Sequence, residues 1–488
     1  MDNREPEAPV KVVASFPPDE DDSPSFRLLF GGFLLLMIWL PLPLGSNRHW
    51  AWGIMATWTF LLLAVWAISH LQRPMVANPL LRNHPFPFIL FLGFSLIPLF
   101  QVIPLNIQFL RLLSPASLDM FLYAGQESRS LPISLDTQAT MAMWLKTTAY
   151  LTGGWLVLVL ARTRQRLTWL AWIMLLTGVA EAFYGLAMVL SGIEMIWWLP
   201  KWSSQGSAAG TFVNRNHFAG FLEMTIPLGF GLLIARLPSR SRESSWKEMI
   251  QYDLKFLFSQ TGIVFILVVT MFIGLFLTNS RGGAAALLFS LFLISGLTFF
   301  RSYSSTREKR LMAPILAISI LAGIWLGLGN LTGRLINTEL EDKSRTAVFE
   351  ATLGKIANYP MFGSGGGTFQ YTFPLYRPEK IHRFYDHTHN DYLEMLADFG
   401  VVGFSLLALA TGICWWIMLR SYLKRRDPLA RGLLFASLSG TLSLALHGLY
   451  DFNLQIPSNA FYFVVLLAMG LQAGQLPHQS RRKGKPLV

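Results

Sequence analysis

The chain has little charge and almost no cysteine. Only 14% of its 488 residues are charged, whereas 52% are hydrophobic. This excludes an ordinary soluble globular protein, because a surface of that size needs far more charge. The single cysteine, Cys414, lies in an apolar run, which excludes an intramolecular disulfide and a cysteine-ligated metal site. A nucleotide-binding loop is absent too, since "GSGGG" (363–367) follows no predicted strand and lacks the P-loop lysine.

Long apolar runs dominate the rest of the chain. A run of roughly 18 or more apolar residues indicates a membrane-spanning helix, because in lipid the backbone polar groups must pair within the segment. Twelve such runs are present: 27–45, 50–69, 86–104, 141–161, 166–190, 217–237, 260–278, 282–300, 312–330, 399–420, 430–448 and 459–476. The sequence therefore predicts an all-α fold, a polytopic membrane bundle of about 12 transmembrane helices.

The basic residues predict the orientation of this bundle. The net charge is +12, and cations gather in alternate connections such as "RTRQR" (162–166), "REKR" (307–310) and the terminal "RRKGK" (481–485). Cytoplasmic loops of membrane proteins carry this excess of Lys and Arg. We therefore expect both termini in the cytoplasm, and we interpret the positive charge as a topology signal and not as a nucleic-acid-binding patch.

The predicted spans leave two tails and two long outer loops. Residues 1–26 are acidic and proline-rich, which predicts a disordered cytoplasmic tail without a signal peptide, and residues 477–488 form a basic cytoplasmic tail. Between them, 27–476 form one transmembrane domain. Its outer loops, 105–140 and about 331–398, have the length of loops that carry function. In the second, the apolar spacing predicts a helix over 344–360, and "GSGGG" is expected to be a flexible turn over the site.

The stretch "DHTHNDYLEMLADFGVVGF" (386–404) concentrates polar residues directly ahead of an apolar run. A helix through this stretch places His389, Leu393, Leu396, Gly400 and Gly403 on one face. The two glycines let the helix approach a neighbour closely and hold His389 roughly 16 Å above them, at 1.5 Å per residue. A histidine at the mouth of a bundle suits proton abstraction, because its usual pKa is near neutral pH.

Three interpretations of the histidines stay open at this point. In the first, His387 and His389 are solvated loop residues. In the second, His382, His387 and His389 bind zinc, although the third ligand fits the spacing poorly. In the third, His389 is a catalytic base.

Two arginines favour the third interpretation. Arg215 and Arg281 are expected at the outer ends of two spans, on the same side and at a similar depth as His389. A single arginine in such a place often does no more than reach the lipid headgroups. Guanidinium groups also bind phosphate oxygens bidentately and do not lose their charge. Together with a base, the pair indicates a site for a phosphorylated, lipid-borne substrate.

The segment "HNDYLEMLADFGVVG" (389–403) resembles the H-[N/S/Q]-x9-G-x-x-G motif of the O-antigen ligase and polymerase superfamily. Other blocks are similar to that family in the same order: "NRNHFAGFLEM" (214–224), "TNSRGG" (278–283), "SRTAVFEATLGKIANYPMFGSGGGTF" (344–369) and "HGLYDFNLQIPSNA" (447–460). Each block is weak alone and the set is specific. The resemblance covers roughly residues 140 to 475.

This resemblance implies a GT-C-like glycosyltransferase of the bacterial inner membrane that requires no metal or other cofactor. It implies transfer of a glycan from undecaprenyl diphosphate to an acceptor hydroxyl at the periplasmic face, and direct attack by that hydroxyl predicts inversion. By motif position, it implies His389 as the essential base and Arg281 as a ligand of the diphosphate. Arg215, which matches less tightly, Arg345 and Asn390 are further candidates for substrate binding.

Two questions stay open. A transporter or flippase of lipid-linked saccharide is the alternative function, with Glu181 and Glu223 as intramembrane relay groups. Against it, the hydropathy shows no repeated halves and the polar residues gather at one face. The acceptor is the second question, because lipid A core, a growing polysaccharide and a protein hydroxyl all fit, and this choice separates a ligase from a polymerase.

Overall fold

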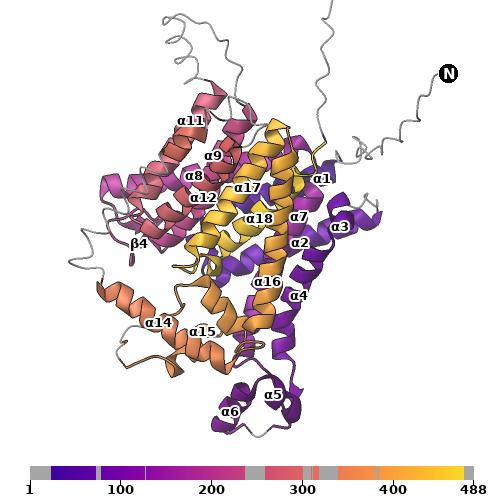
Figure 1. Cartoon of the computed structure of the whole chain (residues 1–488), viewed down its shortest axis with the longest axis vertical. Coiled ribbons are helices and arrows are strands. Elements are labelled where there is room, and N and C mark those ends of the chain that lie inside the picture. Colours follow the sequence, from indigo (N-terminus) through magenta and orange to yellow (C-terminus); the bar gives the residue numbers. More distant parts are fainter. Residues whose placement is uncertain are drawn as a thin grey trace, which may run out of the picture.

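Figure 1 shows a bundle of helices in the computed structural model. The structure describes residues 23–72, 78–126, 128–236, 259–300, 309, 312–317, 339–379, 381 and 384–477. Within this part of the chain the only strands are two short hairpins, β1 (Leu105–Asn106) with β2 (Ser130–Leu131) and β3 (Met195–Ile196) with β4 (Leu199–Pro200). The predicted all-α class is therefore confirmed.

In the described part of the chain, seven helices are long and apolar enough to cross a membrane. They are α2 (His49–Gln72), α8 (Arg164–Ser191), α9 (Arg215–Arg236), α11 (Gln260–Leu277), α12 (Arg281–Phe300), α16 (Asp391–Lys424) and α17 (Pro428–His447). Four more helices occupy predicted spans: α1 (Pro24–Trp39), α4 (Phe86–Val102), α7 (Thr137–Leu160) and α18 (Pro457–Ala473). Most of the predicted span 312–330 and nearly all of both tails lie outside the described residues. The protein is thus a multi-pass helical membrane protein, and the count of about 12 spans and the GT-C-like label stay predictions.

Helix α9 forms the centre of the bundle. Of its most apolar window, 94% is buried, because α8, α11, α12, α17 and α18 all pack around it. Its contact with α17 is close: a Cβ on Gly432 would stand 2.0 Å from the carbonyl oxygen of Gly231. In Figure 1, α8, α9, α11 and α12 lie to the left, α16, α4 and α2 lie to the right, and α17 and α18 lie between them.

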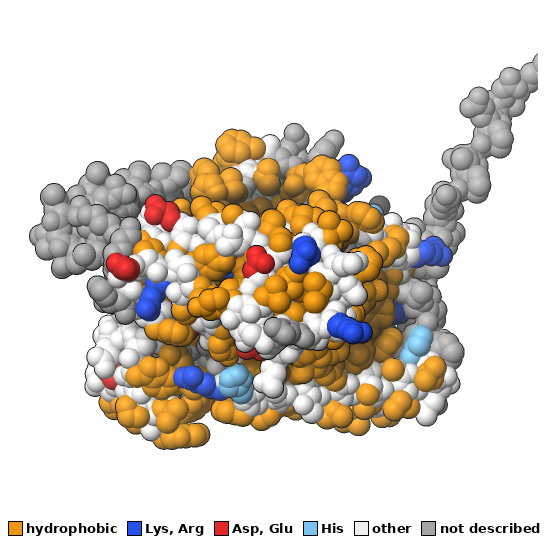
Figure 2. Space-filling view, turned by 90° about the horizontal axis from the view of Figure 1, so that it is seen from below, with side chains coloured by type: hydrophobic (Ala, Val, Ile, Leu, Met, Phe, Trp, Pro, Cys, Tyr) orange, Lys and Arg blue, Asp and Glu red, His pale blue; other side chains and the backbone are white. Residues whose placement is uncertain are grey.

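The two long loops fold at the same end of the bundle, at the bottom of Figure 1. The first loop contains α5 (Ile107–Leu113) and α6 (Pro115–Tyr123). The second contains α14 (Glu339–Asn358), α15 (Phe369–Thr372) and the 3-10 turn η3 (Phe373–Leu375). The predicted helix over 344–360 is confirmed by α14. We call this end of the bundle, which carries the two long loops, the site end. Figure 2 looks onto the site end from below and shows more hydrophobic than charged side chains on it.

Short elements complete the described chain. They are η2 (Leu44–Ser46), α3 (Pro79–Asn83) and η4 (Asn453–Gln455). Of these, η4 positions the site, because it links α17 to α18 directly after Asp451.

Helix α16 is broken near the site end. Gly400 has φ 65° and ψ −176°, a combination that is essentially restricted to glycine. The break leaves backbone groups unpaired, and the loop after α14 pairs with them: Ser364 N–H donates to Ala397 O at 3.0 Å, and Val401 N–H donates to Pro360 O at 2.8 Å.

The glycine-rich turn 363–367 therefore docks into this break. Gly367 N–H donates to Asp398 Oδ2 at 2.7 Å, and Gly366 N–H donates to Gln101 Oε1 at 3.0 Å. Residues 363–366 are buried. The expectation of a flexible turn over the site is wrong, because the backbone of the turn completes the broken helix.

Candidate active site

His389 lies just outside α16 and not on it. Asn390 caps the helix, since its Oδ1 accepts the N–H groups of Tyr392 and Leu393, both at 3.0 Å. His389 precedes this cap in a left-handed conformation, φ 56°. The predicted helical face shared by His389, Leu393 and Gly400 is therefore wrong: the helix starts after His389, and the break interrupts it before Gly403.

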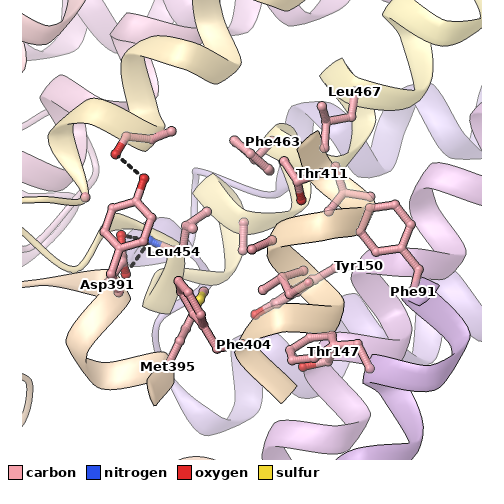
Figure 3. A pocket seen from close by; sticks show the side chains of 18 of the residues that line it. Phe91, Thr147, Tyr150, Asp391, Met395, Phe404, Thr411, Leu454, Phe463 and Leu467 are labelled. Atoms are coloured by element: carbon pink, nitrogen blue, oxygen red, sulfur yellow. Dashed lines mark hydrogen bonds between the residues drawn. The ribbon is translucent and has the colours of Figure 1, made fainter. Parts of the chain in front are cut away.

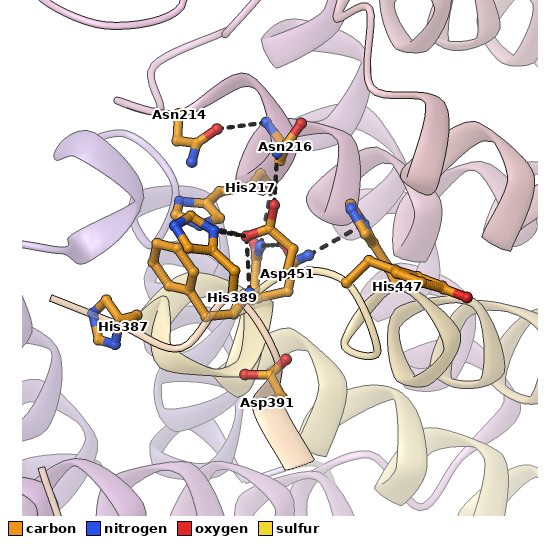
Figure 4. Close-up of polar contacts among 12 residues, drawn as sticks. Asn214, Asn216, His217, His387, His389, Asp391, His447 and Asp451 are labelled. Carbon is orange, nitrogen blue, oxygen red and sulfur yellow. Dashed lines mark hydrogen bonds and ion pairs between the residues drawn. The ribbon is translucent and has the colours of Figure 1, made fainter. Parts of the chain in front are cut away.

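The left-handed turn directs the His389 ring toward Asp451, as Figure 4 shows. Nδ1 of His389 lies 3.9 Å from Oδ1 of Asp451. That nitrogen is buried and has no hydrogen-bond partner among the described residues, yet 22% of the side chain is exposed. The accessible part of the ring is therefore the part turned away from Asp451.

Asp451 is the hub of the cluster, and only 1% of its side chain is exposed. Its carboxylate accepts hydrogen bonds from Asn216 Nδ2 at 2.6 Å and from the N–H of Phe452 at 2.8 Å. His217 Nε2 lies 3.5 Å from the same Oδ1 that His389 faces. Burial acts to raise the pKa of Asp451, but the hydrogen bond and charge of His217, with the other histidines, lower it below its usual range. Asp451 is therefore an anion.

The pKa of His389 is lowered from its ordinary value. Burial is the main cause, the Asp451 charge opposes it, and the charges of Arg345 and His217 add to it. The imidazole is therefore neutral at neutral pH, which is the state that accepts a proton. A neutral histidine with an exposed edge and a buried anion behind it is equipped to act as a base.

A second buried pair lies next to this cluster. Nδ1 of His447, at the end of α17, is 2.8 Å from Oε1 of Glu223 on α9, and Ser443 donates to the other oxygen at 2.8 Å. The start of α12 presses against the pair, because a Cβ on Gly283 would stand 2.5 Å from Glu223 Oε1. Glu223, which the transporter alternative assigned to a proton relay, is thus paired locally with His447 and Ser443.

The arginines stand at the same end. Arg215 is the first residue of α9 and donates from Nη1 to Ser207 Oγ at 3.2 Å. Asn279, two residues before Arg281, donates to the same hydroxyl at 3.1 Å. Ser207 therefore ties Arg215 to the hairpin that carries Arg281, and Asn216 ties the start of α9 to Asp451. The structure brings the predicted arginines to one corner beside the His389 cluster, and their roles stay predictions.

Arg345 and Asn390 flank the cluster. Arg345 Nη1, on α14, donates to the carbonyl of Tyr450 at 3.4 Å, one residue before Asp451. Asn390 uses its oxygen to cap α16 and its Nδ2 to donate to Leu449 O at 3.0 Å. Both ends of the Asn390 amide are engaged within the protein, so it positions the helix start, and a contact between Asn390 and substrate stays a prediction.

The zinc interpretation gains no support from the part of the chain that is described. His387 Nδ1 is 2.6 Å from Glu394 Oε1, whereas His389 Nδ1 turns to Asp451. No group of three or more His, Cys, Asp or Glu that could hold a metal ion occurs among the described residues, and His382 lies outside them. The rings of His387 and His389 instead pack on Phe452, with centroids 4.3 and 4.8 Å away.

A narrow apolar cavity of about 240 Å³ runs beside α16, and Figure 3 looks into it. Phe91, Phe404 and Leu467 line its length, and Asp391 and Tyr392 lie at the end near the cluster. Asp391 accepts the N–H of Leu454 at 3.1 Å, so this end adjoins η4 and Asp451. The cavity suits an uncharged hydrocarbon chain whose polar end lies near His389.

Sequence reasoning missed Asp451, Asn216 and Glu394. Asp451 is the only carboxylate in the block 447–460 that was quoted for its family likeness. The available signal was its presence in that block, because charged residues are rare in this chain. Neither the Asn216 contact nor the Glu394 contact has any signal in the sequence.

Comparison with known proteins agrees with these motifs. Residues 266–408 match the family model described as O-antigen ligase, a range that contains Arg281, Arg345 and His389. None of the curated proteins matches the chain. The match covers less than a third of the chain, and it supports a similarity of this segment to the O-antigen ligase and polymerase superfamily.

Proposed function

We propose that the protein transfers a glycan from undecaprenyl diphosphate to an acceptor hydroxyl, at the periplasmic face of the bacterial inner membrane, with both termini in the cytoplasm. The neutral His389 with the buried Asp451 anion behind it is the observation that carries this proposal. The O-antigen ligase match supports the reaction class, a membrane enzyme acting on lipid-linked glycan.

The acceptor hydroxyl attacks the anomeric carbon of the donor sugar. A carbon–oxygen bond forms to the acceptor, and the bond between the sugar and the diphosphate breaks. The leaving diphosphate keeps the electron pair, and the hydroxyl proton passes to His389. Attack on the face opposite the leaving group inverts the anomeric centre. Proton transfer of this kind contributes about 10²–10⁴-fold to the rate.

The arginines stabilise the leaving group. Arg281 and Arg215 stand at the starts of α12 and α9 and are linked through Asn279 and Ser207. Fixed cations that face developing negative charge usually make the largest catalytic contribution. Arg345 adds positive charge on the α14 side. No metal is needed in this scheme, because the guanidinium groups bear the charge.

Asp451 and His217 support the base. As His389 takes up the proton, the imidazolium that forms is stabilised by the Asp451 charge 3.9 Å away. The apolar cavity beside α16 accommodates hydrocarbon of a lipid-borne substrate. The acceptor is lipid A core, a growing polysaccharide or a protein hydroxyl. This choice separates a ligase from a polymerase, and the same catalytic group serves each acceptor.

The test uses purified protein in nanodiscs, with release of free undecaprenyl diphosphate as the readout. We expect His389→Ala to abolish release, to keep donor binding and to be rescued in part by added imidazole. His387→Ala is the matched control and should be milder, and EDTA should have no effect. Full activity of His389→Ala would refute the base. Loss of activity in both variants and in EDTA would indicate zinc.

A transport assay separates the alternative class. In liposomes, a flippase would move labelled lipid-linked sugar across the bilayer without releasing diphosphate. Glu223 is paired with His447 next to the site, so we expect release and not movement.

A further inference from the structure

The loop between α8 and α9 presents tryptophans at the site end, outside the range matched by the family model. A two-residue turn, Trp197–Trp198, joins β3 to β4. Trp198 is 80% exposed, and Trp202 is exposed as well. Exposed aromatics of this size mark a contact surface.

The turn is built rigidly. Trp197 has φ 56°, which is a costly conformation for a bulky residue. Three contacts hold it there: its N–H donates to Tyr184 Oη at 2.8 Å, its Nε1 donates to Leu42 O at 2.8 Å, and its ring packs on Tyr184 at 5.5 Å. The strained turn projects Trp198 outward.

The base of the hairpin is an ion pair between a buried lysine and a partly exposed glutamate. Lys201 Nζ lies 2.9 Å from Glu194 Oε2, and the lysine side chain is completely buried. Lys201 also donates to Ser207 O at 2.6 Å, and Ser207 Oγ accepts from Arg215 at 3.2 Å. A continuous chain of contacts thus connects the tryptophan turn to Arg215.

The lipid-facing side of α8 leads directly to this turn. Exposed apolar residues recur every seven positions along the helix: Trp169, Leu176, Phe183 and Leu190. A spacing of seven keeps them on one face, and exposed Ile193 continues the stripe to Trp198. Aliphatic neighbours such as Leu190 and Ile193 fit lipid, whereas tryptophan is enriched where the membrane meets water.

We propose that the hairpin 195–200 inserts Trp198 into the membrane–water interface on the periplasmic side of the inner membrane. The inserted hairpin thereby sets the height of Arg215 relative to the lipid headgroups. The partner is the lipid surface itself. The second half of this inference rests on the proposed function, because a diphosphate carried by a lipid lies at headgroup depth, where Arg215 must meet it.

Depth-dependent quenching tests the insertion without any turnover. Trp198→Cys is made together with Cys414→Ala, which removes the only native cysteine, and is labelled with bimane in nanodiscs. Lipids carrying a spin label at acyl position 5 or 16 supply two depths. We expect strong quenching by the shallow label and weaker quenching by the deep one. Glu350→Cys, on the exposed side of α14, is the control and should show little of either.

Quenching at position 198 no stronger than at position 350 would overturn the insertion. Protection of the label by soluble oligosaccharide in place of lipid quenching would also overturn it, and would indicate a sugar-binding platform. Because neither outcome needs catalysis, this result is distinguishable from failure of the proposed function.

Kinetics test the link to Arg215. Trp198→Ala should raise the KM for the lipid-linked donor several-fold and change kcat little, because the displaced hairpin misplaces a binding group. Trp198→Tyr keeps an amphipathic ring and should stay near the wild-type KM. An unchanged KM in Trp198→Ala would refute the link.

Discussion

The carboxylate of Glu394, within the first turns of α16, accepts a hydrogen bond from the backbone N–H of Thr388 at 2.9 Å. Thr388 Oγ1 in turn donates to Asn390 O at 2.6 Å and accepts the N–H of Asn390 at 3.0 Å. His389 lies between these anchored residues, so its left-handed conformation is held from both sides. Such a conformation costs about 1–3 kcal/mol and persists only where neighbours enforce it.

Glu394 is therefore expected to position the base without touching substrate. Glu394→Ala should lower kcat by about 10²-fold, the cost of misplacing a catalytic group by about 1 Å, and leave the donor KM unchanged. Glu394→Gln keeps one acceptor oxygen, so its kcat should lie between the values of the wild type and of Glu394→Ala. Glu350→Ala, on the exposed side of α14, is the control and should be neutral. A kcat of Glu394→Ala equal to that of the control would contradict this role.

The pH dependence follows from the state of His389. Only the neutral ring accepts a proton, so activity falls as the pH drops through its pKa. Burial lowers this pKa from 6.5, and the acid limb of the kcat profile should therefore lie below pH 6.5. A limb at or above that pH would show that another group limits the rate.

Asp451→Asn should move that limb. The Asp451 charge opposes the effect of burial on the pKa of His389, so its removal should lower the pKa and shift the acid limb to lower pH. The maximal kcat should drop by about 10²-fold, because the imidazolium loses its counter-ion. Asp386→Asn removes a more exposed charge and should do little. If the acid limb of the kcat profile lies at the same pH in Asp451→Asn as in the wild type, Asp451 does not influence the pKa of His389.

Arg281→Lys tests the diphosphate contact. A lysine keeps the charge but replaces a planar fork by a point donor, so we expect most activity to be lost and donor binding to weaken. Arg420→Lys, at the other end of α16 where Arg420 packs on Trp416, is the matched control and should be silent. Near-wild-type turnover in Arg281→Lys would contradict the contact between Arg281 and the diphosphate.

Gly400→Ala tests the break in α16. An added Cβ would stand 2.3 Å from Met361 O in a conformation that costs a non-glycine residue about 1–3 kcal/mol, so Tm in detergent should fall. Gly412→Ala is the control in the same helix, because a Cβ there would meet no atom of the described residues within 4 Å and alanine should be neutral or stabilising. Equal Tm values for the two variants would refute the importance of the break.

The orientation of the bundle is tested by cysteine labelling in cells. Thr368 in the second loop is buried, so the exposed Tyr371 is the better reporter. An impermeant thiol reagent should label Tyr371→Cys and should not label Lys424→Cys, at the opposite end of α16. The native Cys414 is buried and gives little background. Labelling of Lys424→Cys alone would invert the proposed topology.

The sequence by itself determined the class of the protein and the positions of most of its helices. Long apolar runs form helices wherever they occur, because hydrogen bonding within the segment is a local requirement. Helix α14, in the second loop, was predictable for a different reason, because its apolar residues recur at helical spacing and end before Pro360. The motif at 389–403 and the isolated arginines also stand out in the sequence, because charge and polarity are rare in this chain.

Only the tertiary structure decided how these residues meet. The glycine motif predicted a straight helix with His389 on its face, whereas Asn390 starts the helix later and the loop 360–367 fills a break at Gly400. Asp451 lies 62 residues after His389, and Asn216 reaches it from a third helix at 2.6 Å. Local spacing carries no information about which distant backbone will satisfy an unpaired carbonyl or which carboxylate will stand behind a ring. Those partners are chosen by the packing of α9, α16 and α17, and this packing places the half-buried His389 ring in front of the Asp451 carboxylate.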